Sequence, residues 1–357
     1  MTLASRQVSF VDDRHEMLAL LRRNFGSSQD QRFDWRHTGN PAGPAWSWFV
    51  YDKKTLGTVA LATVFPRNMY VDGKRVLGGQ VGEFVVEAGY RSLGPAVLMQ
   101  RTTFEPVDRG SLTFCYDCPP HDQGMSTFVR LGMRANAEVY RYAYPLRCDQ
   151  NVDKKFGRHL WTKPLLAAVN LALRLRAARW RTPNLEIAHY NERFGDEFSA
   201  LDKSLSSAGN IRASRSTEDL NWRYREDPLS STCLPTGTRG QYKVLVARRN
   251  MELVAFAVFF IQSDGIASLV DLFGHELPNA GTALLDAVIQ ICTQKQVSSI
   301  HAFCSEASEL RYLLAGLGFR RRERSSRVVA YARPDDRIGK LVHLGQQWTF
   351  NQVEVML

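Results

Sequence analysis

The chain has 357 residues, a formal net charge of +10 and a hydrophobic fraction of 44%. This length is more than one typical domain needs, and the apolar content is sufficient for two hydrophobic cores. No apolar run is long enough to span a membrane and the polar N-terminal stretch lacks a signal-peptide core. We therefore exclude the membrane-spanning and secreted classes and expect a cytoplasmic protein.

The cysteines give no indication of a metal site. Six cysteines are scattered through apolar surroundings, and Cys115 and Cys118 form the only close pair. A zinc site needs a second pair or a histidine cluster nearby, and the sequence has neither. We expect reduced, structural cysteines and no metal cofactor.

The first part of the chain predicts a helix followed by antiparallel strands. Residues 12–25 have the apolar spacing of an amphipathic helix. Residues 32–44 are interpreted as a turn-rich segment, because they combine polar residues with glycine and proline. Two strands are predicted next, over residues 46–51 and 56–65.

A strand, a tight polar loop and a helix then follow one another directly. The strand is predicted over residues 76–86, after a hairpin turn at Asp72-Gly73. Gly94 lies in the loop, and Pro95 stands where a first helical residue belongs. The start of such a helix presents unpaired backbone N–H groups and the positive end of the helix dipole, which together suit an anionic phosphate.

The loop carries a motif of known type. Arg91, Gly94 and Ala96 spell R-x-x-G-x-A, which resembles the acyl-CoA pyrophosphate loop of the GNAT acyltransferase superfamily. By itself the pattern also fits an ordinary strand-loop-helix connection. The resemblance implies an acyl-CoA co-substrate, with acetyl-CoA expected. The residues that it implies in cofactor binding are Val85, Val86, Arg91, Ser92, Leu93, Gly94, Pro95 and Ala96.

The order of the predicted elements agrees with this superfamily. Another strand is predicted over residues 111–116 and a helix over residues 127–133, closed by a glycine. The F-x-x-L-G-M run at 128–133 resembles the superfamily's second signature. The implied fold class is α/β with a mixed sheet: two tandem GNAT-like domains, each a mostly antiparallel twisted sheet flanked by helices.

An internal repeat extends the resemblance to the second half. Trp35-Arg36 recurs as Trp222-Arg223 with a proline at a matching offset, a shift of 187 residues. Leu131-Gly132 recurs as Leu317-Gly318 at a shift of 186. Two landmarks far apart in the chain keep nearly the same shift, which indicates a tandem duplication.

The second copy has lost part of the motif. Shifted by 187, Arg91 lands on Pro278 and Glu83 lands on Val270. We expect the second copy to keep the fold and to have lost or weakened the acyl-CoA site. The predicted division is an N-terminal domain over 1–147, a basic helical connector over 148–184, a degenerate second domain over 185–335 and a tail over 336–357.

Acyl transfer from a thioester to an amine needs a base, donors for the oxyanion and a proton for the leaving thiolate. The resemblance implies Glu83 as the base and a backbone N–H near Val85 or Val86 as the oxyanion donor. The superfamily often has a tyrosine acid where this chain has Phe128, which cannot donate a proton. Tyr116 and His121 are the candidate substitutes, although either also fits a packed aromatic or a surface histidine. Proton loss to solvent is the remaining alternative.

Asp34, Trp35 and Arg36 are candidate substrate-binding residues. They lie where the superfamily commonly binds substrate, and an arginine beside a tryptophan suits an anionic or sugar group. Because the Trp-Arg pair recurs in the second copy, a shared packing role fits equally well.

The positive charge is concentrated in one segment. Residues 147–181 carry nine basic and two acidic side chains. Within them, residues 161–181 have a helical apolar spacing, and a basic amphipathic helix suits peripheral contact with an anionic membrane. A linker helix packed between domains is the alternative interpretation.

The leading hypothesis is an acyl-CoA-dependent N-acyltransferase that acts on an amine acceptor. The tandem arrangement resembles GNAT proteins of bacterial polysaccharide and cell-envelope loci, which implies an amino sugar or polysaccharide precursor, rather than nucleic acid, as partner. One alternative is an aminoacyl-tRNA-dependent transferase of the peptidoglycan type, which the basic charge would suit. A non-catalytic acyl-CoA-binding protein is another, and Phe128 would suit it. The sequence leaves the oligomeric state open.

Overall fold

The computed structural model describes residues 3–26, 29–91, 93–147, 185–206, 210–228, 241–334 and 337–355. The predicted basic connector, its 161–181 helix and Ser92 lie outside the described residues. Within these ranges, no helix is both long enough and apolar enough to cross a membrane.

The first half of the chain combines six strands with five helices in the described ranges. Its strands are β1 (Leu3–Gln7), β2 (Trp46–Asp52), β3 (Thr58–Val71), β4 (Lys74–Val86), β5 (Phe114–Asp117) and β6 (Ala137–Pro145). Its helices are α1 (Arg14–Phe25), α2 (Gln29–His37), α3 (Leu93–Thr102), α4 (Glu105–Asp108) and α5 (Asp122–Arg130), with a short turn of helix η1 (Ala88–Tyr90) before α3.

The second half repeats this arrangement of strands and helices. Its strands are β7 (Glu186–His189), β8 (Ile211–Ala213), β9 (Lys243–Arg249), β10 (Glu252–Ile261), β11 (Ile266–Gly274), β12 (Ser299–Ser305) and β13 (Arg320–Ala332). Its helices are α8 (Asp196–Ser204), α9 (Thr217–Tyr224), η2 (Leu277–Gly281), α10 (Thr282–Gln294) and α11 (Leu310–Leu317). The tail forms α12 (Arg337–Val342), η3 (Gly345–Gln347) and α13 (Gln352–Val355).

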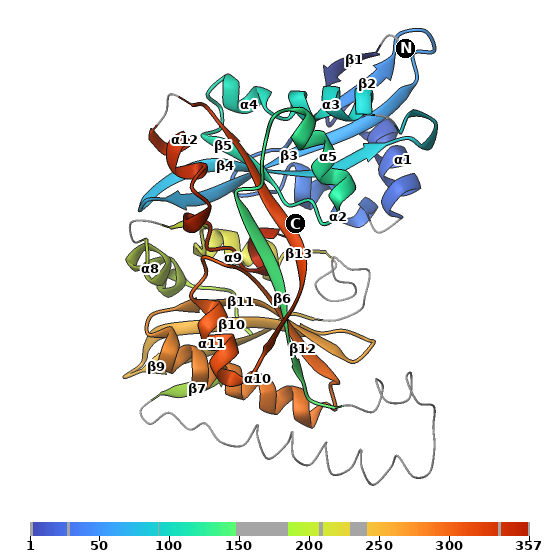
Figure 1. Cartoon of the computed structure of the whole chain (residues 1–357). Helices are drawn as coiled ribbons and strands as arrows, with labels where there is room; N and C mark the ends of the chain where they lie inside the picture. The colour runs from blue at the N-terminus through green and yellow to red at the C-terminus, as the bar shows by residue number, and fades with distance from the viewer. Residues whose placement is uncertain are drawn as a thin grey trace.

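The strands of both halves join in one sheet. Across the described residues the order is β1-β2-β3-β4-β5-β13-β6-β12-β11-β10-β9-β7, and β8 pairs with β3. Each half contributes five strands in the same order, and each sheet is then completed by a strand of the other half. β13 pairs with β5, and β6 pairs with β12. Figure 1 shows β6 and β13 crossing between the two halves.

Helices cover both faces of each half. α3 and α5 pack on one face of the first half, in a core that contains Val64, Met99 and Phe128. α1 and α2 cover the opposite face. In the second half, α10 and α11 cover one face and α8 and α9 the other. β2, β3, β10 and β11 contain runs of consecutively buried residues, and because successive side chains of a strand point to opposite faces, both faces of the sheet receive apolar groups.

Most of the predicted elements are present. The predicted strands, the first helix and the hairpin are confirmed, and Asp72 and Gly73 have the positive φ values that a tight hairpin turn requires. The prediction of a turn-rich segment over 32–44 was wrong in its first part, because α2 continues through His37. Phe33 and His37 lie one helical turn apart and are both buried, and this spacing outweighed the polar composition.

Two boundaries differ from the predictions. The helix predicted over 127–133 begins earlier, at Asp122, and ends at Arg130 before the left-handed Gly132. The strand predicted over 111–116 is Phe114–Asp117. The predicted domain boundaries stay a prediction, and the exchange of β6 and β13 means that the sheet continues across them.

Candidate functional site

The central strand of the first half separates from its parallel neighbour. β4 pairs with β5 only from Gly78 to Gln80, and its last residues extend beyond that pairing. A β-bulge also interrupts the pairing of β4 with β3, because Thr63 faces Gly82 whereas Leu61 faces Val85. The bulge places one extra residue on β4 and disturbs the ladder of backbone hydrogen bonds.

An open cleft of about 570 Å³ lies at this end of β4. It is bounded by the end of α1, the end of β4, the loop before α3, and the segment that leads into α5. The described residues that line it are Asn24, Phe25, Phe84, Val85, Val86, Arg91, Ala96, Pro120, His121, Gln123, Gly124, Ser126 and Thr127. Val85, Val86, Arg91, Ala96 and His121 were predicted from the sequence, and the structure brings these five together.

The other predicted loop residues lie at the start of α3. Leu93 opens this helix, Gly94 is exposed and Pro95 is buried. A Cβ atom added to Gly94 would meet nothing within 4 Å, so the helix N-terminus is open to a ligand. The Arg91 Nε atom donates a hydrogen bond to the Val86 carbonyl at 3.2 Å, which ties the loop to the strand.

The cleft is suited to an anion. Its described lining includes Arg91 and His121 and contains no carboxylate. The N-terminus of α3 adds unpaired backbone N–H groups and a positive dipole end. Arginine and helix N-termini are common ligands of phosphate groups.

Glu83 does not line the cleft but is buried beside it. Its Oε2 atom accepts hydrogen bonds from the His37 Nε2 atom at 2.8 Å and from the Thr63 hydroxyl at 3.2 Å. Its Oε1 atom forms an ion pair with the Arg36 guanidinium at 3.1 Å. Burial alone would raise the pKa of Glu83, but the charges of His37 and Arg36 and these hydrogen bonds lower it to about 2.

The two candidate acids occupy different places. His121 lies in the cleft, immediately before α5. Tyr116 is buried on the other face of the sheet among Trp348 and Phe350, and its hydroxyl donates to the Glu354 carbonyl at 3.1 Å. Burial raises the pKa of Tyr116 well above its usual value. The structure therefore places His121, and not Tyr116, where a ligand in the cleft would meet it.

The predicted substrate residues of α2 have separate surroundings. Asp34 is exposed and forms an ion pair with Arg14 at 2.9 Å. Trp35 stacks on Trp222 with ring centroids 4.6 Å apart. Each of these indoles donates its N–H to the backbone carbonyl of the other, at 2.9 and 3.0 Å. Arg36 pairs with Glu83 instead, so the three residues do not converge on one described pocket.

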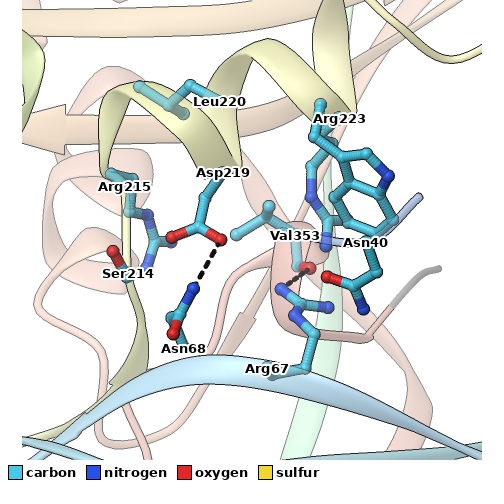
Figure 2. Close-up of a pocket in the computed structure, with 10 residues that line it drawn as sticks. Asn40, Arg67, Asn68, Ser214, Arg215, Asp219, Leu220, Arg223 and Val353 are labelled. Carbon is cyan, nitrogen blue, oxygen red and sulfur yellow. Dashed lines mark hydrogen bonds between the residues drawn. The ribbon is translucent and has the colours of Figure 1, made fainter. Parts of the chain in front are cut away.

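The seam between the halves is packed with polar side chains. Figure 2 shows Arg67 and Asn40 of the first half facing Asp219 and Arg223 of the second. The cavity among them measures about 10 Å³, room for about one water molecule. A substrate therefore has no space in this seam in the present conformation.

Three residues of interest were missed by sequence reasoning. His37 directly follows the Trp-Arg pair and contacts Glu83, and its place in the repeat was the available signal. Phe25 is the last residue of the helix predicted over 12–25, and it is half exposed at the cleft. Asp117 ends β5, and burial raises its pKa to about 7, which nothing in the sequence indicated.

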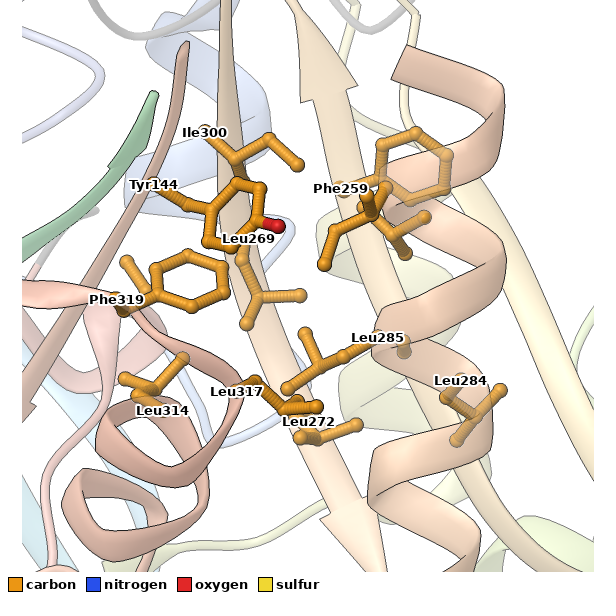
Figure 3. Packing of buried hydrophobic residues seen from close by; sticks show 14 of the residues in the cluster. Tyr144, Phe259, Leu269, Leu272, Leu284, Leu285, Ile300, Leu314, Leu317 and Phe319 are labelled. Atoms are coloured by element: carbon orange, nitrogen blue, oxygen red, sulfur yellow. The ribbon is translucent and has the colours of Figure 1, made fainter. Parts of the chain in front are cut away.

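The corresponding region of the second half is filled. Gly281 stands where the first half has Gly94, at the predicted shift of 187. A Cβ atom there would lie 2.8 Å from Leu313, 3.4 Å from Leu277 and 3.5 Å from Leu272. Figure 3 shows Leu272 of β11 beside leucines of α10 and α11 in this core. Leucine side chains thus occupy the space that is open in the first half.

Comparisons with known proteins support the fold. No protein-family model and no curated protein matches the sequence. Among solved structures, the chain is similar to a probable N-acyltransferase of Enterococcus faecalis, with a TM-score of 0.64 and 12% identity over 93% of this chain and 72% of that one. The chain is also similar to a GCN5-related N-acetyltransferase of Anabaena variabilis. The TM-score is 0.64 and the identity 12%, over 93% of this chain and 73% of that one.

A third similar structure contains a bound acyl donor. It is the N-myristoyltransferase of Saccharomyces cerevisiae with bound myristoyl-CoA, with a TM-score of 0.57 and 14% identity over 96% of this chain and 88% of that one. The predicted fold class is therefore confirmed: the chain has the mixed α/β fold of GNAT-like N-acyltransferases.

Proposed function

We propose that this chain is an acyl-CoA-dependent N-acyltransferase whose donor site is the cleft of the first half. The observation that carries the proposal is the open cleft at the R-x-x-G-x-A loop, where Arg91, Ala96 and the end of β4 meet. The fold shared with N-acetyl- and N-myristoyltransferases supports it.

Different residues of the cleft would bind different parts of the donor. Arg91 and the N-terminus of α3 would hold the pyrophosphate, because both favour negative charge. The backbone of Val85 and Val86 lies at the end of β4 that extends beyond its pairing with β5. It would run beside the pantetheine arm and direct an N–H group to the thioester oxygen. The half-exposed Phe25 would cover the apolar part of the arm.

The reaction that follows joins the acceptor nitrogen to the thioester carbonyl carbon. The amine lone pair attacks this carbon, the carbon–sulfur bond breaks, and CoA leaves as a thiolate that takes up a proton. The nitrogen loses one proton to a base or to water. In this proposal His121 would donate the proton to the leaving sulfur, and its place in the lining of the cleft supports this role.

The finer assignments belong to the same proposal. We take acetyl-CoA as the donor and an amino sugar or polysaccharide precursor as the acceptor, on the resemblance of the sequence motifs. Peripheral membrane contact through the basic segment at 161–181 also stays a proposal, because this segment lies outside the described residues.

Calorimetric titration with acetyl-CoA and free CoA tests the donor site. The wild type should bind one equivalent, and Gly94→Trp should abolish binding because the indole would occupy the open start of α3. Gly195→Trp is the matched control, because Gly195 also precedes a helix, has open space around it and lies in the second half. Absence of CoA binding by the wild type would refute the proposal.

Turnover then separates an enzyme from a binding protein. The release of CoA thiol is measured with amino sugars and simple primary amines as acceptors, for donors from acetyl to myristoyl. Transfer of the acyl group supports the enzyme. Tight CoA binding without transfer to any amine would favour the non-catalytic alternative, for which Phe128, buried in the core, is the supporting observation.

A further inference from the structure

Glu83 has an unusual backbone conformation at the bulge beside the cleft. Its φ is +50°, in the left-handed region that residues other than glycine and asparagine seldom adopt. Such a conformation is strained and persists only where the surrounding structure enforces it. The contacts of the Glu83 side chain are therefore expected to hold this backbone in place.

Those contacts come from one buried cluster. His37 and Arg36 reach Glu83 from α2, and Thr63 reaches it from β3. The His37 ring also stacks on Phe33 with centroids 4.3 Å apart, and its Nδ1 atom meets the Phe33 carbonyl at 2.8 Å. Both ring nitrogens of His37 therefore have a partner, the Phe33 carbonyl and the Glu83 carboxylate.

The second half lacks this cluster. At the shift of 187, Tyr224 replaces His37 and Val270 replaces Glu83, while Arg223 is retained. A bulge still forms at Val270, since Val258 faces Asp271 and Phe259 faces Leu269, but Val270 is not left-handed. The Tyr224 hydroxyl is buried without a hydrogen-bond partner. A bulge can therefore form without a carboxylate at this position. The carboxylate of Glu83 is found in the half whose bulge residue has a left-handed backbone and whose cleft is open.

The same geometry is poorly suited to proton transfer. Both Glu83 oxygens face cationic or hydroxyl groups within the protein, and the residue does not line the cleft. A base must reach the amine directly or through one water molecule. Glu83 can instead influence the backbone of its own strand, because the three residues that follow it in β4 line the cleft.

We propose that Glu83 is a positioning residue, which fixes the left-handed bulge of β4 so that the backbone after it meets the acyl carbonyl of the donor. This inference rests on the proposed function. It replaces the role of base that the family resemblance implies for Glu83, and it assigns Arg36 and His37 to the support of Glu83.

Four substitutions distinguish backbone geometry from proton transfer. Glu83→Gly and Glu83→Asn introduce residues that adopt a positive φ readily, whereas Glu83→Ala and Glu83→Val introduce residues that do not. All four remove the carboxylate and leave Arg36 and His37 without it. Differences among the four variants therefore report the backbone and not the lost charge.

The expected result is a split within this set. The Gly and Asn variants should retain at least tenfold more acyl transfer than the Ala and Val variants, with the pH profile of the wild type. Affinity for acetyl-CoA relative to free CoA should fall in the Ala and Val variants only, since this ratio reports contacts with the acyl carbonyl. Equal activity in all four variants, or equal affinity ratios, would overturn the proposal.

Two further measurements keep the test decisive. Arg36→Met retains the carboxylate. The kcat of this variant should fall, while its affinity for free CoA and its pH profile should stay the same as those of the wild type. A shifted pH profile would instead indicate that Glu83 transfers the proton. The same four substitutions at Glu276, which is also left-handed and paired with an arginine, should leave binding unchanged. Affinity for free CoA tests the proposed function separately, because its absence in the wild type would refute the donor site itself.

Discussion

The two halves of the molecule share an architecture and differ in one region. Both have the same strand order, helices on both faces, a bulge in the central strand and a Trp-Arg pair on a helix. Among the residues that the structure describes, the first half has an open space at the start of the following helix, where the second half has Leu272, Leu277 and Leu313. The fold therefore persists without the cleft, and a few side chains decide whether a donor can bind.

The largest expected effect concerns what the halves have in common. Trp35→Ala and Trp222→Ala should each lower the free energy of unfolding by about 4 kcal/mol, because each removes one ring of the stacked pair and an indole hydrogen bond. Urea denaturation checks the size of each effect. The double variant should lose less than the sum, since the two rings contact each other. Strictly additive losses would show that the halves are not coupled here.

The next prediction concerns Glu83, which corresponds to Val270 in the second half. The native pKa of Glu83 is about 2 against a usual 4.5, so its ionised form stabilises the native state above pH 4.5, by about 3 kcal/mol. This contribution is lost as the pH falls from 4.5 through 2. The stability difference between wild type and Glu83→Gln, measured by denaturation, should therefore shrink across that window. A difference independent of pH would contradict the assigned ion pairs.

A third prediction converts the first cleft into the filled second one. At the shift of 186, Leu313 corresponds to Thr127 and Tyr312 to Ser126. Thr127→Leu combined with Ser126→Tyr should weaken CoA binding about a hundredfold, or about 2.7 kcal/mol, without unfolding the protein. The reverse pair, Leu313→Thr with Tyr312→Ser, should lower stability and create no binding. Calorimetric titration of both double variants with CoA tests this prediction. If the Thr127→Leu, Ser126→Tyr variant bound CoA as tightly as the wild type, the donor site would lie elsewhere.

The smallest expected effect concerns the loop arginine. Arg91→Ala should weaken CoA binding about tenfold, or about 1.4 kcal/mol, because one charge-assisted contact to phosphate is lost. The salt dependence of the affinity should decrease as well. Pro278→Arg should give the second half no affinity, since leucines occupy the neighbouring space. Equal affinities of wild type and Arg91→Ala would remove this residue from the site.

Local patterns were sufficient for much of the fold and for part of the cleft. The predicted strands β2 to β4, the Asp72-Gly73 turn and the R-x-x-G-x-A loop depend on neighbouring residues, and each was found from the sequence. The repeat also identified Val270 and Pro278 as the altered positions of the second half. These features share one property, namely that the residues involved lie close together in the chain.

Contacts between distant residues could not be predicted in the same way. The sequence around Glu83 does not indicate that its Oε2 atom lies 2.8 Å from the His37 Nε2 atom. Nor does the sequence around Tyr116 indicate that its side chain points to the opposite face of the sheet and donates to the Glu354 carbonyl. The exchange of β6 and β13 joins strands whose sequences give no sign of their partners. The left-handed φ of Glu83 is likewise a product of tertiary contacts, since glutamate has no intrinsic preference for it.

The exchange of strands has a consequence for how the protein is made. β5 ends at Asp117, but its neighbour β13 begins at Arg320, so the first sheet acquires this strand only when most of the chain has left the ribosome. Until then the open edge of β5 and the unpaired β6 are exposed to wrong partners. The first sheet can therefore be completed only after the residues of β13 have been synthesised.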